Sequence, residues 1–219
     1  MERNPFAPLF EELPDALPVF PLASAFLLPT GHLPLNIFEP RSVQMVEDAL
    51  AGRRMIGMVQ PRIGVCCEGK PALYKTGCAG KIIEFTENSD GRYTIKLAGL
   101  YRFDIVEELV TPRLYRVIKP DWTAYRSDNR AFQCLDLDRV HLKTLLKAYF
   151  EKHEMACDWK AVEGVPDGKL ITCLSMVCPF DVAEKQALLE AQCCRTRAAL
   201  FMAMLELAIR EPPLKGGCH

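Results

Sequence analysis

The sequence predicts an α+β protein in which a β-rich region comes first and a helical region follows. From Leu17 to about Asp121 the apolar residues form short or alternating runs, as in β-strands. Beyond Arg130 they recur every three or four residues, as in helices. Two prolines within Gly31–Leu50 add a third observation, because their placement indicates an edge strand that leads directly into a helix.

The change of periodicity predicts two subdomains in the 219-residue chain. We expect a β-rich subdomain at residues 17–125 and a helical subdomain at residues 126–211. In this interpretation, residues 1–16 are an amino-terminal extension and residues 212–219 are a carboxy-terminal tail.

Composition argues against several classes of partner. With 49% apolar and 25% charged residues, the chain has enough hydrophobic material for a globular core. Its net charge of -1 and the absence of a lysine and arginine cluster argue against nucleic acid and anionic membrane surfaces as partners. No segment approaches the ~20 apolar residues of a membrane-spanning helix, and the amino terminus does not resemble an export signal.

The ten cysteines do not predict a disulfide framework, because the chain is large and contains the adjacent pairs Cys66–Cys67 and Cys193–Cys194. We interpret them as reduced thiols, with Cys66–Cys67 in an exposed loop and Cys78 buried as a small hydrophobe. The sequence therefore predicts a cytoplasmic location.

Seven runs are strand-like: LPVFPL, LPLNIF, RMIGMVQ, GKIIEF, RYTIKLAG, FDIVEELV and RLYRVIKP. The turn signal Asn88–Gly91 should join GKIIEF and RYTIKLAG into a hairpin, with Tyr93, Ile95 and Leu97 on its buried face.

A strand and a helix meet within Leu33–Leu50. Pro34 has no amide hydrogen to donate and so favours an edge strand, whereas Pro40 suits the first turn of a helix. Helical spacing places three apolar residues on one face of that helix: Val43, Val46 and Leu50.

Three further helices are predicted. The first follows an apolar pattern from Phe132 to Tyr149, and the second covers Leu170–Val177. The third starts with a capping box formed by Asp181 and Glu184 and continues until Glu211–Pro212–Pro213 ends it. Its apolar stripe should lie in the core: Ala187, Leu188, Ala191, Cys194, Ala198, Phe201, Leu205 and Ala208.

No catalytic constellation emerges from the residues. The segment Gly77–Ile82 lacks the first glycine and the final serine or threonine of a phosphate-binding loop. The cysteine spacing does not match a zinc site, and the pair of Asp138 and His141 has no nucleophile to activate. We therefore predict no catalytic residues, no metal and no cofactor.

Several separated segments, in the same order, resemble the amino-terminal substrate-binding domain of Lon proteases. They are LPVFPLASAFLLPTG, GHLPLNIFEPRSVQMVEDAL, TGCAGKIIEF, DGRYTIKLAGLYRFDIVEE and DVAEKQALLE. The resemblance spans Leu17–Ile209. One departure is Ser42, where the family commonly has tyrosine after Glu-Pro-Arg.

The resemblance implies a small antiparallel or mixed β pseudo-barrel with one short helix, followed by a helical bundle. It implies a stand-alone bacterial module without the ATPase and peptidase parts of a Lon protease, and hence a protein that is not an enzyme. Such a module would bind unfolded polypeptide or exposed hydrophobic segments in protein quality control.

The candidate polypeptide-binding surface comes from the loop and corner that match the family: Leu28, Pro29, Leu35, Phe38, Glu39 and Arg41. The aliphatic and aromatic members would provide apolar contacts, although Leu35 and Phe38 also suit the β core. Glu39 and Arg41 would contact polar groups of the ligand or form an ion pair that braces the corner. The unpaired edge strand offers backbone groups to an incoming peptide strand.

Two other functions are left open. An adaptor that docks on a Lon-type protease would use the helical subdomain, with Phe201 and Met204 exposed. A small-molecule-binding or enzymatic module would instead use a cleft between the subdomains. Homodimer formation is also left open.

Overall fold

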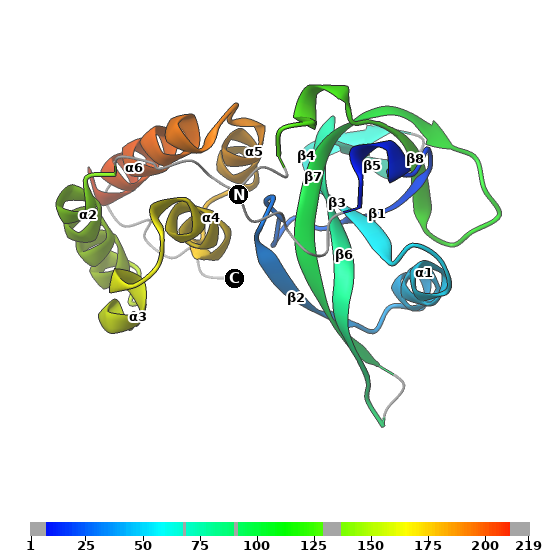
Figure 1. Cartoon of the computed structure of the whole chain (residues 1–219), viewed down its shortest axis with the longest axis horizontal. Coiled ribbons are helices and arrows are strands. Elements are labelled where there is room, and N and C mark those ends of the chain that lie inside the picture. Colours follow the sequence, from blue (N-terminus) through cyan, green and yellow to red (C-terminus); the bar gives the residue numbers. More distant parts are fainter. Residues whose placement is uncertain (1–7, 68, 90–91, 129–136, 211–219) are drawn as a thin grey trace. The chain divides into compact units, whose positions relative to one another are not determined.

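The computed structural model describes residues 8–67, 69–89, 92–128 and 137–210. Strands dominate its first half and helices its second (Figure 1), which confirms the predicted α+β class. The chain divides into two compact units, and the division passes through helix α4 (Asp167–Val177). The first unit comprises residues 1–131 and 172–190, and the second comprises residues 132–171 and 191–219.

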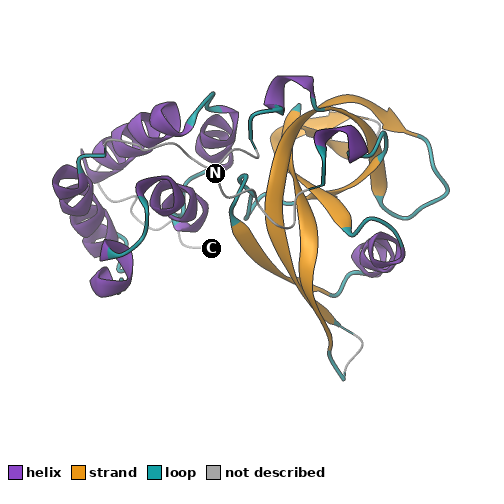
Figure 2. Ribbon diagram, in the orientation of Figure 1, coloured by secondary structure: helices purple, strands orange, loops and turns teal. Residues whose placement is uncertain are grey.

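The main sheet of the first unit closes into a barrel (Figure 2). Its strands follow the order β2-β7-β6-β3-β1-β8, and an additional pairing of β7 with β8 completes the closure. The β1–β3 pair is parallel and the other pairs are antiparallel, so the sheet is mixed. The strands are β1 (Leu17–Pro21), β2 (His32–Ile37), β3 (Met55–Val59), β6 (Thr76–Glu87), β7 (Tyr93–Leu109) and β8 (Arg116–Asp121).

Strand β7 is central to this topology because it has two partners in succession along one edge. It pairs with β2 over Tyr93–Ala98 and with β8 over Asp104–Leu109, while β6 pairs with it from Tyr93 to Asp104. The sequence predicted two separate strands, RYTIKLAG and FDIVEELV. They form one strand because β6 pairs with the residues where the two runs meet, including Gly99, Arg102 and Phe103.

Phe103 lies at the centre of the barrel core and is fully buried. A Cβ atom at Gly57 or Gly77 would come within 3.0 Å of its ring, so glycine is required at both positions. The Trp122 ring packs edge-on against Phe103, with 5.5 Å between the ring centroids. The buried residues of the cluster around Phe103 are Leu13, Leu17, Val19, Met55, Val59, Ala79, Leu100, Tyr101, Phe103 and Ile118.

The predicted hairpin is confirmed. β6 and β7 pair in antiparallel register, with Ile82 opposite Leu97 and Phe85 opposite Ile95. Ile95 and Leu97 are buried, as their alternation predicted. Part of the predicted turn, residues 90–91, lies outside the described residues.

The predicted corner is also confirmed. β2 pairs with β7 alone, and helix α1 (Pro40–Ala51) has proline at its first position. The buried face of α1 is rotated from the predicted one, because Met45, Val46 and Ala49 are buried whereas Val43 and Leu50 are only half-buried. Ser42 lies on the buried face, where a larger tyrosine would need more space.

A two-stranded sheet, β4 (Pro61–Cys67) and β5 (Lys70–Leu73), includes the Cys66–Cys67 segment, so the predicted loop there is wrong. Cys66 is exposed, as predicted, but lies on a strand. Gly64 and Gly69 adopt φ angles of 74° and 77°, which other residues rarely adopt. Two 3₁₀ turns complete the first unit, at Phe10–Glu12 and Thr123–Tyr125.

Helix α5 (Val182–Glu190) packs against strand β6. Its capping box is present, since the Asp181 carboxylate accepts from the Glu184 amide and the Glu184 carboxylate accepts from the Asp181 amide, both at 2.8 Å. On its inner face, Gln186 donates to the Thr76 carbonyl at 3.1 Å and accepts from Gln60 at 3.0 Å.

A buried ion pair links α5 to the barrel. The Arg102 guanidinium donates to the Asp128 carboxylate at 2.7 and 2.8 Å and to the Leu189 carbonyl at 3.0 Å. Both charged side chains are only 6% exposed. Burial alone would lower the pKa of Arg102, but the Asp128 hydrogen bond and charge outweigh burial and raise that pKa.

The long carboxy-terminal helix that we predicted is wrong, because the chain leaves helical geometry at residues 191–193. A new helix, α6 (Cys194–Arg210), begins there. The Cys193 carbonyl accepts the Arg197 amide at 3.0 Å, and the Cys193 thiol lies 3.2 Å from the Thr196 hydroxyl. Cys193 thus occupies the amino-terminal cap position of α6.

In the second unit, α2 (Arg139–Lys152) packs against α6, and α3 (Trp159–Glu163) follows. Asp138 caps α2 by accepting the His141 amide at 2.9 Å. The predicted helix began at Phe132, and residues 132–136 lie outside the described residues. The buried aliphatic and aromatic residues on the two packed helices are Leu142, Leu146, Tyr149, Phe150, Ala198, Phe201, Met204 and Leu205.

Leu205→Asp should destabilise the second unit by about 3 kcal/mol or more, because it places a charge at a fully buried position. Leu207→Asp is the matched control on the same helix. Leu207 is 60% exposed, and its substitution should cost less than about 1 kcal/mol. Urea denaturation followed by far-ultraviolet circular dichroism measures both. Equal losses of stability would contradict the assigned orientation of α6.

Candidate functional site

The six residues predicted for the binding surface lie in three places: the loop before β2, β2 itself, and the corner between β2 and α1. Leu28 and Pro29 are buried in the loop before β2. The Leu28 carbonyl accepts from the Gly31 amide at 2.9 Å, and a Cβ atom at Gly99 would lie 2.0 Å from that carbonyl oxygen. In this conformation Leu28 and Pro29 belong to the packed interior at the start of β2, so they cannot reach a ligand while the loop packs against β7.

Leu35 and Phe38 have different environments. Leu35 lies opposite Ile95 in the register of β2 and β7 and is half-buried. Phe38 follows the last residue of β2 and is 64% exposed. Phe38 is therefore the large apolar side chain that the corner presents to solvent.

Glu39 and Arg41 form an ion pair, with 2.6 Å between the Glu39 carboxylate and Arg41 Nε. Both side chains are substantially exposed, at 44% and 64%, so the pair contributes about 0–1 kcal/mol. The pair spans the first residues of α1, where Glu39 occupies the cap position. This arrangement matches the bracing role considered for these two residues.

Arg41 also lines a groove of about 480 Å³, which we name the Arg41 groove. Its walls come from β1, α1, the β4–β5 sheet and the segment that joins β7 to β8. The lining residues are Pro21, Arg41, Pro61, Lys70, Pro71, Glu108, Leu109, Val110, Thr111, Arg113, Leu114, Tyr115 and Arg116. Of these residues, only Arg41 was predicted from the sequence, because their side chains converge only when distant elements pair.

The β7–β8 connection is fastened to α1. Asp48 accepts a hydrogen bond from the Tyr115 hydroxyl at 2.8 Å and pairs with Arg113, and Gln44 accepts the Leu114 amide at 3.0 Å. Burial raises the pKa of Tyr115, although the charge of Arg113 opposes that effect. Tyr115 therefore remains a neutral hydroxyl donor to Asp48 at neutral pH.

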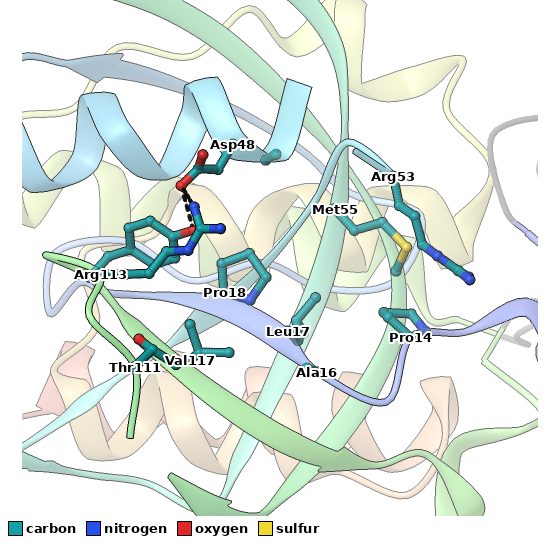
Figure 3. Close-up of a pocket in the computed structure, with 12 residues that line it drawn as sticks. Pro14, Ala16, Leu17, Pro18, Asp48, Arg53, Met55, Thr111, Arg113 and Val117 are labelled. Atoms are coloured by element: carbon teal, nitrogen blue, oxygen red, sulfur yellow. Dashed lines mark hydrogen bonds and ion pairs between the residues drawn. The ribbon is translucent and has the colours of Figure 1, made fainter. Parts of the chain in front are cut away.

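A second groove, of about 350 Å³, borders the same contact between α1 and the β7–β8 connection (Figure 3). The Asp48–Arg113 pair forms part of its wall, and Pro14, Pro18 and Met55 line its apolar part. Thr111, Arg113 and Tyr115 line both grooves. The β7–β8 connection thus acts as a shared wall.

The charges of the Arg41 groove are unevenly paired. Arg116 makes a two-pronged contact with Glu108 at 2.5 and 2.9 Å and also donates to the Pro71 carbonyl at 2.8 Å. Lys70 is exposed and has no ion-pair partner among the described residues. Within the described part of the chain, the groove therefore contains one lysine whose charge no neighbouring carboxylate compensates.

The remaining side chains offer neither a metal site nor an activated nucleophile within the described residues. Within the described ranges, no group of three or more histidine, cysteine, aspartate or glutamate residues is placed to hold a metal ion. Hydrogen bonds from Thr196 lower the pKa of the exposed Cys193 thiol. A threonine hydroxyl does not act as a general base, so this contact does not make Cys193 an activated nucleophile. No described helix has the length and apolar character needed to cross a membrane.

Comparison with protein families decides the assignment. The family model for the ATP-dependent protease La (LON) substrate-binding domain matches residues 16–206. The chain belongs to this family. The predicted resemblance to the Lon amino-terminal domain is thereby confirmed.

Curated relatives of this Lon-family chain are much longer than it. Lon protease 2 of Myxococcus xanthus is 27% identical over 199 residues, which cover 89% of this chain and 24% of the relative. Lon protease of Anaeromyxobacter dehalogenans is 26% identical over 201 residues, which cover 89% of this chain and 23% of the relative. The chain thus spans about a quarter of the length of these relatives.

Solved structures confirm the fold. A Lon N-terminal domain protein from Xanthomonas campestris aligns with a TM-score of 0.58 at 21% identity, covering 86% of this chain and 97% of that one. The N-terminal domain of a Mycobacterium avium complex Lon protease aligns with the same TM-score at 15% identity, covering 89% of this chain and 97% of that one.

Asp48→Ala should release the β7–β8 connection, because it removes the acceptor of Tyr115 and the partner of Arg113. We expect a loss of about 1 kcal/mol in the free energy of unfolding and faster tryptic cleavage after Arg113. Asp15→Ala is the control, since Asp15 is exposed and makes no described contact. Limited proteolysis with mass spectrometry measures the cleavage. Equal cleavage rates for the two variants would show that Asp48 does not hold the β7–β8 connection against α1.

Proposed function

We propose that this Lon-family domain recognises polypeptide substrates by binding segments that are unfolded or expose hydrophobic side chains. The observation that carries the proposal is Phe38, an aromatic residue that is 64% exposed where β2 ends. Family membership supports a substrate-recognition role, and Phe38 supplies a physical means for it.

An aromatic anchor at this place suits a loose hydrophobic preference. Complete burial of such a side chain against a ligand contributes roughly 1.5–3 kcal/mol. Because one anchor of that size gives weak binding, affinity for a long unfolded chain would depend on repeated encounters with several apolar segments. Self-association into a dimer, which we leave as a proposal, would raise the apparent affinity through effective concentration.

Backbone pairing on β2 adds a second contact. Since β2 pairs with β7 alone, its other edge faces no strand among the described residues. Pro34 lies in the middle of that strand and has no amide to donate. An incoming peptide strand would therefore pair over a short stretch only, and the side-chain contacts at Phe38 would contribute most of the binding.

The proposal includes no catalytic step, no metal and no cofactor for this chain. We propose that its partners are polypeptides in a cytoplasmic quality-control process, and that nucleic acid and membranes are not partners. The predicted division at residues 17–125 and 126–211 remains a proposal about which parts fold and act separately.

A second candidate is an adaptor that docks on a Lon-type protease through the helical unit. The two residues expected to support it, Phe201 and Met204, are buried and so do not form such a surface. Val140 and Leu207 are exposed instead, and their sequence neighbours His141 and Glu206 lie 3.2 Å apart across α2 and α6. A pull-down with Val140→Asp and Leu207→Asp variants tests this candidate.

Phe38→Asp should weaken the binding of a labelled, permanently unfolded polypeptide by about tenfold, because an exposed anchor is lost. The free energy of unfolding should change by less than about 0.5 kcal/mol, since Phe38 lies outside the core. Fluorescence anisotropy measures the affinity, with a folded protein of similar size as competitor.

Val106→Asp is the matched control. Val106 is 58% exposed and falls at the irregularity in the β7–β8 register, away from the corner. If the two variants bind equally well, the corner is not the polypeptide-binding surface. If Phe38→Asp unfolds the domain, Phe38 belongs to the core.

A further inference from the structure

We propose that the Arg41 groove selects client segments in which an acidic residue lies within an apolar stretch. This inference rests on the proposed function and specifies the chemistry of its substrate. It assigns a role to a groove formed by parts of the chain that lie far apart in the sequence.

The size of the groove suits a few side chains of an extended peptide. Its volume of about 480 Å³ falls within the range of roughly 300–1,000 Å³ that is typical of ligand-binding sites. Three prolines, Pro21, Pro61 and Pro71, line it and supply rigid apolar surface without amide donors. Recognition there must therefore come mainly from side chains of the groove.

The charges of the groove favour a carboxylate. Four cationic side chains line it, namely Arg41, Lys70, Arg113 and Arg116, against the single carboxylate of Glu108. The three arginines already have carboxylate partners, in Glu39, Asp48 and Glu108 respectively. Lys70 has none among the described residues. A client carboxylate would thus pair with Lys70 without displacing an existing partner.

The apolar rim favours hydrophobic neighbours beside that carboxylate. Val110 is fully exposed and Leu114 is 64% exposed, and both line the groove on the β7–β8 connection. The contacts of Arg113, Leu114 and Tyr115 with α1 hold this connection in place. A segment with an acidic residue between apolar residues would cover Val110 and Leu114 while its carboxylate reached Lys70.

A single uncompensated lysine does not suit a polyanion. Binding to a nucleic acid backbone normally uses several cationic side chains that neutralise successive phosphates, whereas three of the four cations here are already paired. The net charge of -1 adds no long-range attraction to such a ligand. We therefore commit to an acidic polypeptide segment as the occupant.

Two labelled unfolded polypeptides of equal length and apolar content provide the test. One carries aspartate and glutamate within its apolar segments, and the other carries asparagine and glutamine at the same positions. Anisotropy titrations with the whole chain should show about fivefold tighter binding of the acidic polypeptide. The difference should shrink as salt is raised, because an exposed lysine is screened.

Lys70→Glu should abolish the preference for the acidic polypeptide and leave the affinity for the neutral one unchanged. Lys70→Gln, which only removes the charge, should reduce the preference without reversing it. Lys169→Glu is the charge-matched control, since Lys169 is exposed, is unpaired among the described residues and does not line the groove. Circular dichroism confirms that each variant is folded.

The outcomes separate the two proposals. Equal affinity of the unmodified protein for both polypeptides would overturn the acidic preference and leave polypeptide recognition standing. A preference that survives in Lys70→Glu, or that disappears equally in Lys169→Glu, would overturn the assignment to this groove. Failure to bind either polypeptide up to about 1 mM, where association is worth about 4 kcal/mol, would overturn both proposals.

Discussion

The first unit depends on the constraint that a charge buried in its interior must be paired. Arg102 meets that constraint with the Asp128 carboxylate and the Leu189 carbonyl, which lie on different parts of the chain. Removal of either charge would leave its partner buried and uncompensated, at a cost of about 3–5 kcal/mol. The interaction therefore fixes β7, the segment after β8 and the end of α5 together, which explains why α5 belongs to the barrel unit although it is helical.

The same strand that holds this ion pair also positions both proposed binding features. β7 pairs with β2 near one end and with β8 near the other. The Phe38 corner follows β2, and the wall of the Arg41 groove lies between β7 and β8. Helix α1 joins the two features, since it begins beside Phe38 and fastens the β7–β8 connection through Asp48. A rigid scaffold thus carries two surfaces of different chemistry.

Local rules predicted the parts of the structure that local interactions determine. Pro34 and Pro40 located the edge strand and the start of α1, and Asp181 with Glu184 located the start of α5. The break at residues 191–193 was not predictable, because Ala191, Gln192 and Cys193 all fit a helical pattern. The burial of Leu28 and the composition of the Arg41 groove were also not predicted. Both depend on tertiary packing between segments that lie far apart in the sequence.

Pro34 has a further consequence for the proposed binding of unfolded chains. A flat edge strand with a full row of unpaired amides can pair with the edge strand of another molecule, which leads to aggregation. A high local concentration of non-native polypeptide would increase the rate of such aggregation. By removing one donor from the middle of β2, Pro34 interrupts that row of amides. The corner is thereby protected against edge-to-edge polymerisation and co-aggregation, while Phe38, which needs no backbone pairing, stays exposed.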